Sequence, residues 1–421
     1  MNALLLALAA LAPQDGRALA SDYVRAAPGA AREALRAELA EQVAPDAVRA
    51  LAAALAKKGL VYTAGSESEA LREGETEDRL ALTDGFSFEA QGRRWTYAVG
   101  LPSGYGPRER YPLVVDPGHG LMRTREERLE AGQTGVFLGA LAGEDAIFLR
   151  TNVLVECGSD DDRAALQREH GAAWFAAVYD AAIADALGRF AIDPDRVHAI
   201  GLSQSGYYTW QLAAHSAWRF AAVQPQVAVL RDARGWLTNC VGLPVYVLTG
   251  EKDTTTPPEE ARWAASTLKR LASPVHYEEI EGAGHGAWLT GCRDGVEWML
   301  EQRRGPLPRR AALVLRAAGP RLGPFFRIDE LAGDPAPDAA AALIDVEVDG
   351  QTVRIASDDV RRLTLQLSDA LLDLDEPVRV EWNGKTVHEG VVEPSLDALL
   401  GSLAERVDAA RVFPAELALS L

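Results

Sequence analysis

Three side chains that are far apart in the sequence could together carry out nucleophilic catalysis: Ser203, Asp253 and His285. Ser203 lies in HAIGLSQSGYY, residues 198–208, where an apolar stretch ends in a turn of glycine and serine. Asp253 follows the apolar stretch 245–248, and His285 lies between two glycines in EGAGHGAW. A serine becomes a nucleophile when a histidine takes its proton and a carboxylate orients that histidine. These residue types, in this chain order, predict hydrolysis through an acyl-enzyme.

Two serines compete for the place of the nucleophile in this turn. A catalytic serine between a strand and a helix has strained backbone angles, so the residues two before and two after it must be small. Around Ser203 these positions hold Gly201 and Ser205, whereas around Ser205 they hold Ser203 and Tyr207. The steric demand therefore selects Ser203, although either serine could instead be an ordinary helix N-cap.

The acid and the base each have an alternative in the sequence. Glu251 lies two residues before Asp253, and Asp253 itself could form a turn or cap the following helix. His119 in DPGHG is a second candidate base, but it precedes the serine in the chain. We predict that Asp253 is the acid and His285 the base.

An oxyanion formed on the substrate would need backbone N–H donors. One donor is expected at Gln204, directly after the nucleophile at the start of a helix. The other is expected in DPGHGLM, where His119, Gly120 and Leu121 remain alternatives. Three side chains near these motifs could line a pocket, although core packing would explain each as well: Met122, Tyr207 and Trp288.

The segment from residue 80 to residue 304 alternates short apolar stretches with helical patterns. We expect strands within 94–102, 146–156, 196–203, 220–229 and 243–253, an apolar run ended by Pro and Gly at 111–120, and a strand running into a loop at 274–285. Helices are expected at 163–189, 208–216, 261–272 and 291–304. Apolar strands that alternate with helices indicate a mostly parallel sheet covered on both faces. The glycines beside His285 would let its loop carry the imidazole over the strand ends.

The remaining segments predict smaller units on either side. Residues 1–20 have the apolar run and small residues of a signal peptide, so we expect an exported, soluble protein, periplasmic or extracellular; an apolar first helix is the alternative. Residues 21–79 predict a helical segment that leads into the next domain, followed by an acidic loop. Residues 305–421 predict a small β-rich, sandwich-like accessory domain, with hairpin turns at Asp349-Gly350 and Asn383-Gly384.

Composition excludes several classes of partner. The 421 residues include 43 Lys and Arg against 61 Asp and Glu, a net charge of −18. Such a chain should repel nucleic acid and anionic membranes. The N-terminal apolar run is too short to span a bilayer, and no other segment has 18 unbroken apolar residues. Cys157, Cys240 and Cys292 have no metal-binding spacing; they read as buried residues, with Cys240–Cys292 the conceivable disulfide.

The motifs YPLVVDPGHG, IDPDRVHAIGLSQSG, LTGEKDTTTP and GAGH resemble the esterase branch of the α/β-hydrolase superfamily. The resemblance covers roughly residues 80–304. It is nearest to polyhydroxybutyrate-depolymerase-like and feruloyl-esterase-like secreted enzymes and to prolyl-oligopeptidase-type catalytic domains. It implies an α/β-hydrolase fold with a Ser203–His285–Asp253 triad. Two departures from the usual motifs are Ser205 in place of a glycine and GHG in place of HGG.

This resemblance implies a serine hydrolase that cleaves a small or polymer-derived carboxylic ester and needs no metal or organic cofactor. A peptidase of the prolyl-oligopeptidase type is the first alternative, although the residues before the hydrolase segment are too few for the propeller that such enzymes usually carry. A non-catalytic binding protein on a hydrolase scaffold is the second.

Overall fold

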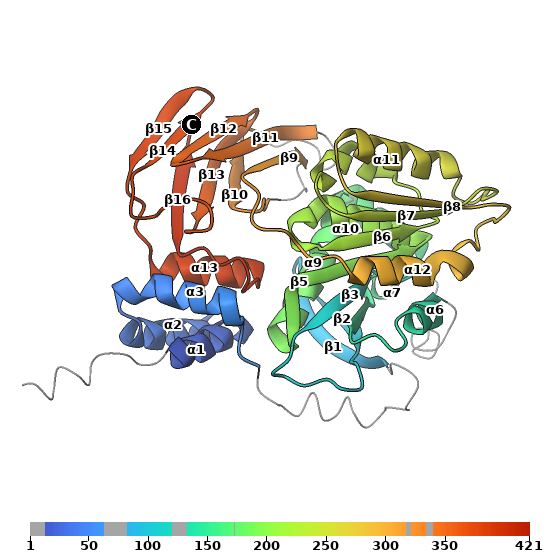
Figure 1. The fold of residues 1–421 in the computed structure, drawn as a ribbon, viewed down its shortest axis with the longest axis horizontal. Helices are drawn as coiled ribbons and strands as arrows, with labels where there is room; N and C mark the ends of the chain where they lie inside the picture. Colours follow the sequence, from blue (N-terminus) through green and yellow to red (C-terminus); the bar gives the residue numbers. More distant parts are fainter. Residues whose placement is uncertain (1–12, 63–81, 120–132, 172, 317–320, 334–339) are drawn as a thin grey trace, which may run out of the picture.

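The computed structural model describes residues 13–62, 82–119, 133–171, 173–316, 321–333 and 340–421 (Figure 1). Residues 1–12, with most of the predicted signal peptide, lie outside the described residues, as do Gly120, Leu121 and Met122. An eight-stranded sheet, a β-rich C-terminal region and a group of N-terminal helices make up the described part of the chain.

The large sheet has the strand order β1-β2-β4-β3-β5-β6-β7-β8, and β3 to β8 run parallel. β1 and β2 form an antiparallel hairpin on its edge. The strands are β1 Leu82–Ala90, β2 Arg93–Gly100, β3 Tyr111–Asp116, β4 Ile147–Thr151, β5 Ile192–Leu202, β6 Ala222–Gln226, β7 Val245–Gly250 and β8 Val275–Ile280. β3 to β7 are wholly or largely buried, as their near-continuous apolar sequences predict.

Helices cover both faces of this sheet (Figure 1). On one face α9 Ala173–Arg189, α10 Gln204–Ser216 and α11 Pro258–Arg270 pack into the largest apolar core. On the other face α6 Gln133–Ala140 and α12 Trp288–Leu300 enclose a second core. The predicted α/β-hydrolase fold, with its mostly parallel and doubly covered sheet, is therefore confirmed.

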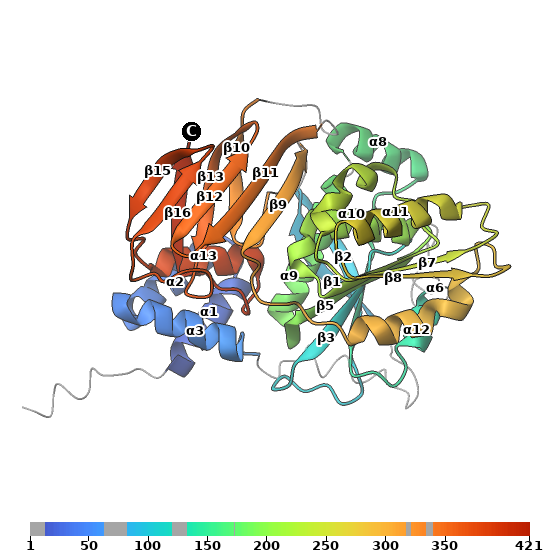
Figure 2. The ribbon, with the colours of Figure 1, turned by 45° about the horizontal axis from the view of Figure 1, so that its top comes forward.

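Two predictions merge elements that the structure separates. The helix expected over 163–189 is two helices, α8 Asp160–His170 and α9, because Gly171 ends α8 with a φ of 82°. The strand expected over 146–156 ends at Thr151, and α7 Val153–Glu156 follows as a single helical turn. The break after α8 matters because it lets α8 lie beside α10 instead of continuing along α9 (Figure 2).

The C-terminal region contains a three-stranded and a five-stranded sheet around a separate core, consistent with the predicted sandwich-like character. Both predicted hairpins are present, with Asn383 and Gly384 at φ 49° and 78° in the second turn. Phe325, Phe326 and Trp382 are buried in this core. The elements are β9 Arg310–Arg316, β10 Phe326–Leu331, β11 Ala340–Asp349, β12 Thr352–Ser357, β13 Val360–Leu367, β14 Val378–Trp382, β15 Lys385–Gly390, α13 Leu396–Arg406 and β16 Ala415–Ser420.

The N-terminal helices α1 Pro13–Arg25, α2 Ala30–Gln42 and α3 Val48–Lys58 lie against α13 (Figures 1 and 2). Arg36 of α2 forms a two-pronged ion pair with Asp397 of α13, at 2.7 and 2.8 Å. Leu399 and Leu403 of α13 belong to the same apolar core as the sheet. Both ends of the chain therefore complete one core with the hydrolase sheet.

A buried ionic cluster also joins α13 to the sheet. Arg304, after α12, pairs with Asp408 at 2.6 Å and with Asp195 at 2.9 Å. Burial raises the pKa of Asp408, but the charge and hydrogen bonds of Arg304 outweigh it and hold that pKa below its ordinary value. Removing one member would leave a buried charge unpaired, so this cluster fixes the end of α13 in place.

The predicted signal-peptide boundary falls inside a packed helix. Ala20 is in α1 and fully buried, and Arg17 donates to the Gly59 carbonyl at 2.7 Å. A cut after Ala20 would remove more than half of α1, including the packed residues Arg17 and Ala20.

Other predictions concern cysteines, membranes and metals. All three cysteines are free and buried, so the conceivable Cys240–Cys292 disulfide is not formed.

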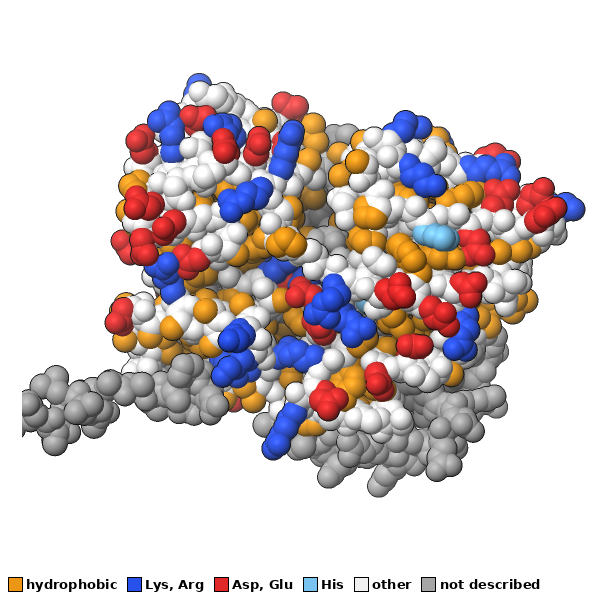
Figure 3. Space-filling view, viewed as in Figure 1, with side chains coloured by type: hydrophobic (Ala, Val, Ile, Leu, Met, Phe, Trp, Pro, Cys, Tyr) orange, Lys and Arg blue, Asp and Glu red, His pale blue; other side chains and the backbone are white. Residues whose placement is uncertain are grey.

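None of the described helices has the length and apolarity to cross a membrane. Among the described residues, no group of three or more His, Cys, Asp or Glu side chains could hold a metal ion. On the face in Figure 3, acidic and basic side chains are interspersed.

Candidate active site

The turn between β5 and α10 holds Ser203 in a strained conformation, with φ 53° and ψ −116°. Its backbone is fixed on both sides: the Ser203 N–H donates to the Gln226 carbonyl at 2.9 Å, and its carbonyl accepts from the Tyr207 N–H at 2.9 Å. Ser203 precedes α10 but makes no side-chain capping bond. The strain and the uncommitted hydroxyl are what a nucleophile elbow requires.

Close approach of strand and helix explains the glycines of this turn. A Cβ at Gly201 would lie 2.4 Å from Thr209 Oγ1 and 2.5 Å from the Ser205 backbone. A Cβ at Gly206 would lie 2.7 Å from the Ala228 side chain. Neither position can hold a larger residue without moving its surroundings, so the glycine one place later than usual has a packing role of its own.

The second serine is part of the turn's internal bonding. Ser205 is fully buried, and its Oγ accepts the Leu202 N–H at 2.9 Å. The structure thus separates the two serines: Ser205 is bonded within the turn, and Ser203 faces the histidine.

Ser203, His285 and Asp253 form one chain of hydrogen bonds. Ser203 Oγ lies 3.0 Å from His285 Nε2, and His285 Nδ1 lies 2.8 Å from Asp253 Oδ2. The carboxylate of Asp253 is fully buried, whereas the His285 ring keeps 31% of its surface exposed. An ion-pairing acid behind a partly open imidazole can orient the ring and stabilise its protonated form. The structure therefore brings the three predicted residues into the geometry of a serine–histidine–acid triad.

Thr256, which the sequence analysis did not single out, holds Asp253 in place. The N–H groups of Thr255 and Thr256 donate to Asp253 Oδ1 at 2.8 and 2.9 Å. Thr256 Oγ1 lies 2.6 Å from Asp253 Oδ2 and 2.8 Å from the Val227 carbonyl. Burial raises the pKa of Asp253, but the hydrogen bonds from Thr256, His285 and Thr255 outweigh it, and the pKa ends below its ordinary value. One oxygen of Asp253 thus forms the predicted turn, and the other serves His285.

The alternative acid and base lie elsewhere. Glu251 is exposed and accepts the Gly282 N–H at 2.8 Å. His119 is buried after β3, and burial together with the positive charge of Arg150 lowers its pKa to about 4. A histidine with that pKa is a poor general base near neutral pH.

The expected oxyanion donors are described only in part. Gln204 is the first residue of α10, directly after Ser203, as predicted. His119 follows the tight Asp116–Gly118 turn, in which Asp116 Oδ1 accepts the Gly118 N–H at 3.0 Å. Gly120 and Leu121 fall outside the described residues. The N-terminus of α10 is therefore the described feature that can stabilise a negative oxygen beside Ser203.

A pocket of about 340 Å³ opens beside Ser203. α8 and α10 form one wall, with Tyr207 accepting a hydrogen bond from Gln167 at 3.2 Å. Val229 and Arg231, just before and at the start of the 3-10 helix η3 Arg231–Cys240, form another part. Tyr207 thus lines the pocket as predicted. Trp288 does not line it among the described residues and packs instead on the core under α12.

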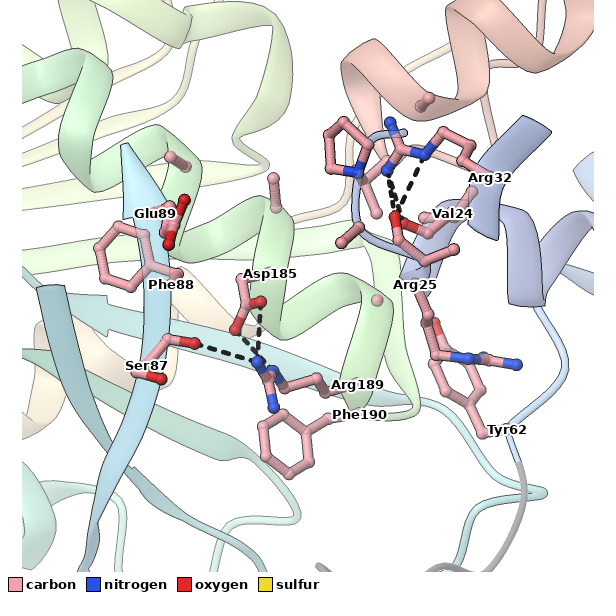
Figure 4. Close-up of a pocket in the computed structure, with 18 of the residues that line it drawn as sticks. Val24, Arg25, Arg32, Tyr62, Ser87, Phe88, Glu89, Asp185, Arg189 and Phe190 are labelled. Carbon is pink, nitrogen blue, oxygen red and sulfur yellow. Dashed lines mark hydrogen bonds and ion pairs between the residues drawn. The ribbon is translucent and has the colours of Figure 1, made fainter. Parts of the chain in front are cut away.

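A larger cavity of about 900 Å³ lies between α1, β1, α9 and α13, and none of the triad residues lines it. In Figure 4, Arg189 turns toward Asp185 and Ser87, and Arg32 turns toward backbone oxygens, including that of Val24. Arg189 Nε donates to Asp185 at 2.7 Å. The arginines of this cavity therefore donate hydrogen bonds to protein acceptors.

No protein-family model matches the chain, and no curated protein matches it either. Several solved structures are similar to the chain. A thermostable esterase has 20% identity and a TM-score of 0.40, over 53% of this chain and 63% of the esterase. The Pyrococcus horikoshii acylaminoacyl peptidase has 13% identity and a TM-score of 0.44, over 57% of this chain and 45% of the peptidase. Est1E from Butyrivibrio proteoclasticus has 15% identity and a TM-score of 0.40, over 52% of this chain and 99% of Est1E. The chain thus spans less than two thirds of the first two proteins.

Proposed function

We propose that this protein is a serine hydrolase that cleaves a carboxylic ester through an acyl-enzyme. The observation that carries the proposal is the continuous hydrogen-bonded chain from Ser203 Oγ through His285 to Asp253. Support comes also from the strained backbone at Ser203, which has no structural use in capping α10. A binding protein on the same scaffold would have no need of either feature.

The reaction begins when Ser203 Oγ attacks the ester carbonyl carbon and His285 Nε2 takes the hydroxyl proton. The developing oxyanion is stabilised at the N-terminus of α10, where Gln204 offers its N–H. The bond to the alcohol oxygen breaks, and His285 returns the proton to the departing alcohol. Water then attacks the acyl-enzyme, losing a proton to His285, and the carboxylic acid leaves as Ser203 regains its proton. Asp253 keeps the imidazole in the tautomer that this cycle needs.

An amide substrate is the second candidate, because the same triad can cleave a peptide bond. The pocket of about 340 Å³ admits a compact group of either kind of substrate, and the substrate panel below separates the two. We also propose that the substrate is a small or polymer-derived ester and that the protein is exported.

A substrate panel tests the proposal. The purified protein is assayed with 4-nitrophenyl esters of short and medium acids beside 4-nitroanilides of single and blocked amino acids, with Ser203→Ala as the blank. Hydrolysis of esters that is absent in the variant is the expected result. Turnover confined to the anilides would assign a peptidase, and no Ser203-dependent turnover of either series would contradict the proposed function.

A further inference from the structure

Arg231 differs from the other charged side chains that line the pocket beside Ser203. Asp160 and Arg163 form an ion pair with each other, and Arg163 also donates to the Leu154 and Gly158 carbonyls at 3.0 and 2.7 Å. Arg231 makes no hydrogen bond or ion pair with any residue that the structure describes. Its guanidinium carbon lies 5.6 Å from the centroid of the Tyr207 ring. Arg231 is exposed, so within the described part of the chain its guanidinium donors remain available to a ligand in the pocket.

The backbone that carries Arg231 is strained and firmly held. Val227 and Arg231 have φ values of 40° and 44°, which non-glycine residues rarely adopt. The Val227 N–H donates to the Leu248 carbonyl at 2.8 Å, and its carbonyl lies 2.8 Å from Thr256 Oγ1. The Leu230 N–H donates to Glu260 at 2.8 Å. Strain of this kind persists only where the surroundings enforce it, and it concentrates at functional sites.

The β-rich C-terminal region fixes the other end of the same segment. Arg231 begins η3, and Asn239 lies near its end. Asn239 Oδ1 accepts the Val314 N–H at 2.8 Å, and Asn239 Nδ2 donates to the Val314 carbonyl at 3.1 Å. This side chain bonds to β9 as a neighbouring strand would. The C-terminal sheet thus anchors the end of η3, the helix whose first residue is Arg231.

An arginine held in this way fits one class of ligand group. A planar guanidinium offers its donors in a fork that matches a carboxylate, and the fixed backbone keeps this exposed side chain at the pocket. Its value is greatest where the protein as a whole is acidic, because the net charge of −18 would otherwise repel an anionic substrate. We propose that the substrate of this hydrolase carries a carboxylate in addition to its ester, and that Arg231 binds that carboxylate. The proposal rests on the proposed function and narrows it to acidic esters.

Two matched pairs of esters test the proposal and distinguish the two places that the carboxylate could occupy. The 4-nitrophenyl monoester of adipic acid and 4-nitrophenyl hexanoate differ only in a terminal carboxylate on the acyl side. The butyrate esters of 4-hydroxybenzoate and 4-hydroxybenzamide differ in a carboxylate on the alcohol side. We expect the wild-type kcat/KM to favour the acidic member of one pair by about tenfold or more. That pair identifies the side of the ester that Arg231 meets.

Variants assign the preference to Arg231. Arg231→Gln should bring the kcat/KM ratio of that pair close to one, mainly through KM, and Arg231→Lys should restore part of it because it restores the charge. Arg234→Gln is the control: Arg234 is exposed on the same η3, lies 4.2 Å over the Trp263 ring and does not line the pocket. It should keep the wild-type preference.

A labelling assay, which needs no substrate turnover, tests carboxylate binding by Arg231 separately from the proposed hydrolase function. Adipate should slow the labelling of Ser203 by a fluorophosphonate in the wild type and not in Arg231→Gln. Labelling that adipate leaves unchanged, together with no preference in either ester pair, would overturn the carboxylate proposal while the hydrolase stands. A preference that survives in Arg231→Gln would overturn it too. A protein whose Ser203 is not labelled at all would instead overturn the proposed function.

Discussion

Two cavities in this molecule differ in size and in how their arginines are used. The larger, of about 900 Å³, is lined by four arginines that each donate hydrogen bonds to protein acceptors: Arg25, Arg32, Arg94 and Arg189. The smaller, of about 340 Å³, is lined by Ser203 and by Arg231, which has no hydrogen-bond or ion-pair partner among the described residues. A binding site must keep donors available for its ligand, whereas a packing gap can bond its polar groups internally. Unused hydrogen-bonding capacity and backbone strain, more than volume, therefore mark the functional pocket.

The largest effect is expected at the small pocket, from Ser203→Ala. Removal of the nucleophile should lower kcat by about 10⁶-fold, because the remaining triad members cannot act without it. Ser205→Gly is the matched control; it removes a hydroxyl bonded within the turn and should keep most of the turnover. Steady-state ester hydrolysis measures both. The reverse pattern, with Ser205 essential and Ser203 dispensable, would mean that the nucleophile is assigned wrongly.

Asp253→Asn should follow in size. An amide in place of the carboxylate favours the wrong imidazole tautomer and cannot stabilise the protonated ring, so kcat should fall by about 10⁴-fold. Glu251→Gln is the control, since that exposed carboxylate accepts the Gly282 N–H and makes no bond to His285 among the described residues. Equal losses in the two variants would show that neither carboxylate is specifically coupled to His285.

Thr256→Val should have a moderate effect on the same pocket. It removes the hydroxyl that lies 2.6 Å from Asp253 Oδ2 but keeps the backbone donor, so turnover should fall by about tenfold. Unchanged kcat would mean that Asp253 is held well enough by the backbone donors alone.

The same variant should change how stability depends on pH. The folded-state pKa of Asp253 lies below its ordinary value of 3.8, so its ionised form stabilises the fold above that pH, and the contribution is lost as pH falls through the folded value. Thr256→Val should raise this pKa and shrink the contribution. Thermal unfolding at about pH 6 and about pH 3 should then show a smaller difference in Tm than in the wild type. An unchanged or larger difference would contradict the role given to Thr256.

The smallest effect is expected in the larger cavity. Arg94 is exposed there and donates to Ser87 Oγ at 2.7 Å. Arg94→Gln should leave ester turnover and the preference for acidic esters unchanged and should alter the free energy of unfolding by no more than about 0.5 kcal/mol. Kinetics and denaturant unfolding test this. A clear loss of turnover would give the larger cavity a part in function and would break the contrast between the two cavities.

The sequence was most informative where one local pattern determines the structure. The apolar runs predicted β3, β5 and β7, the small residues around Ser203 predicted the elbow, and Asn383-Gly384 predicted its hairpin. The break between α8 and α9 was missed, although Gly171 after a run of polar residues is a helix-ending signal.

Other features depend on segments that are distant in sequence and meet only in the fold. The partnership of Thr256 with Asp253 follows from a turn, but its contact with Val227 requires β6 and β7 to be adjacent. Among the described residues, Arg231 has no hydrogen-bond or ion-pair partner. Which groups surround it is decided by the fold, so no local sequence pattern predicts this. The packing of α13 with the N-terminal helices likewise joins residues more than 300 positions apart, as the Arg36–Asp397 pair illustrates.

The most direct test of the account is to locate the adduct of a fluorophosphonate probe. The wild-type protein is labelled, digested and analysed by mass spectrometry, beside Ser203→Ala and Ser205→Gly. The account predicts one adduct, on Ser203, in the wild type and in Ser205→Gly, and none in Ser203→Ala. An adduct on Ser205 or on another serine, or no adduct in the folded wild type, would contradict the assignment of Ser203 as the nucleophile.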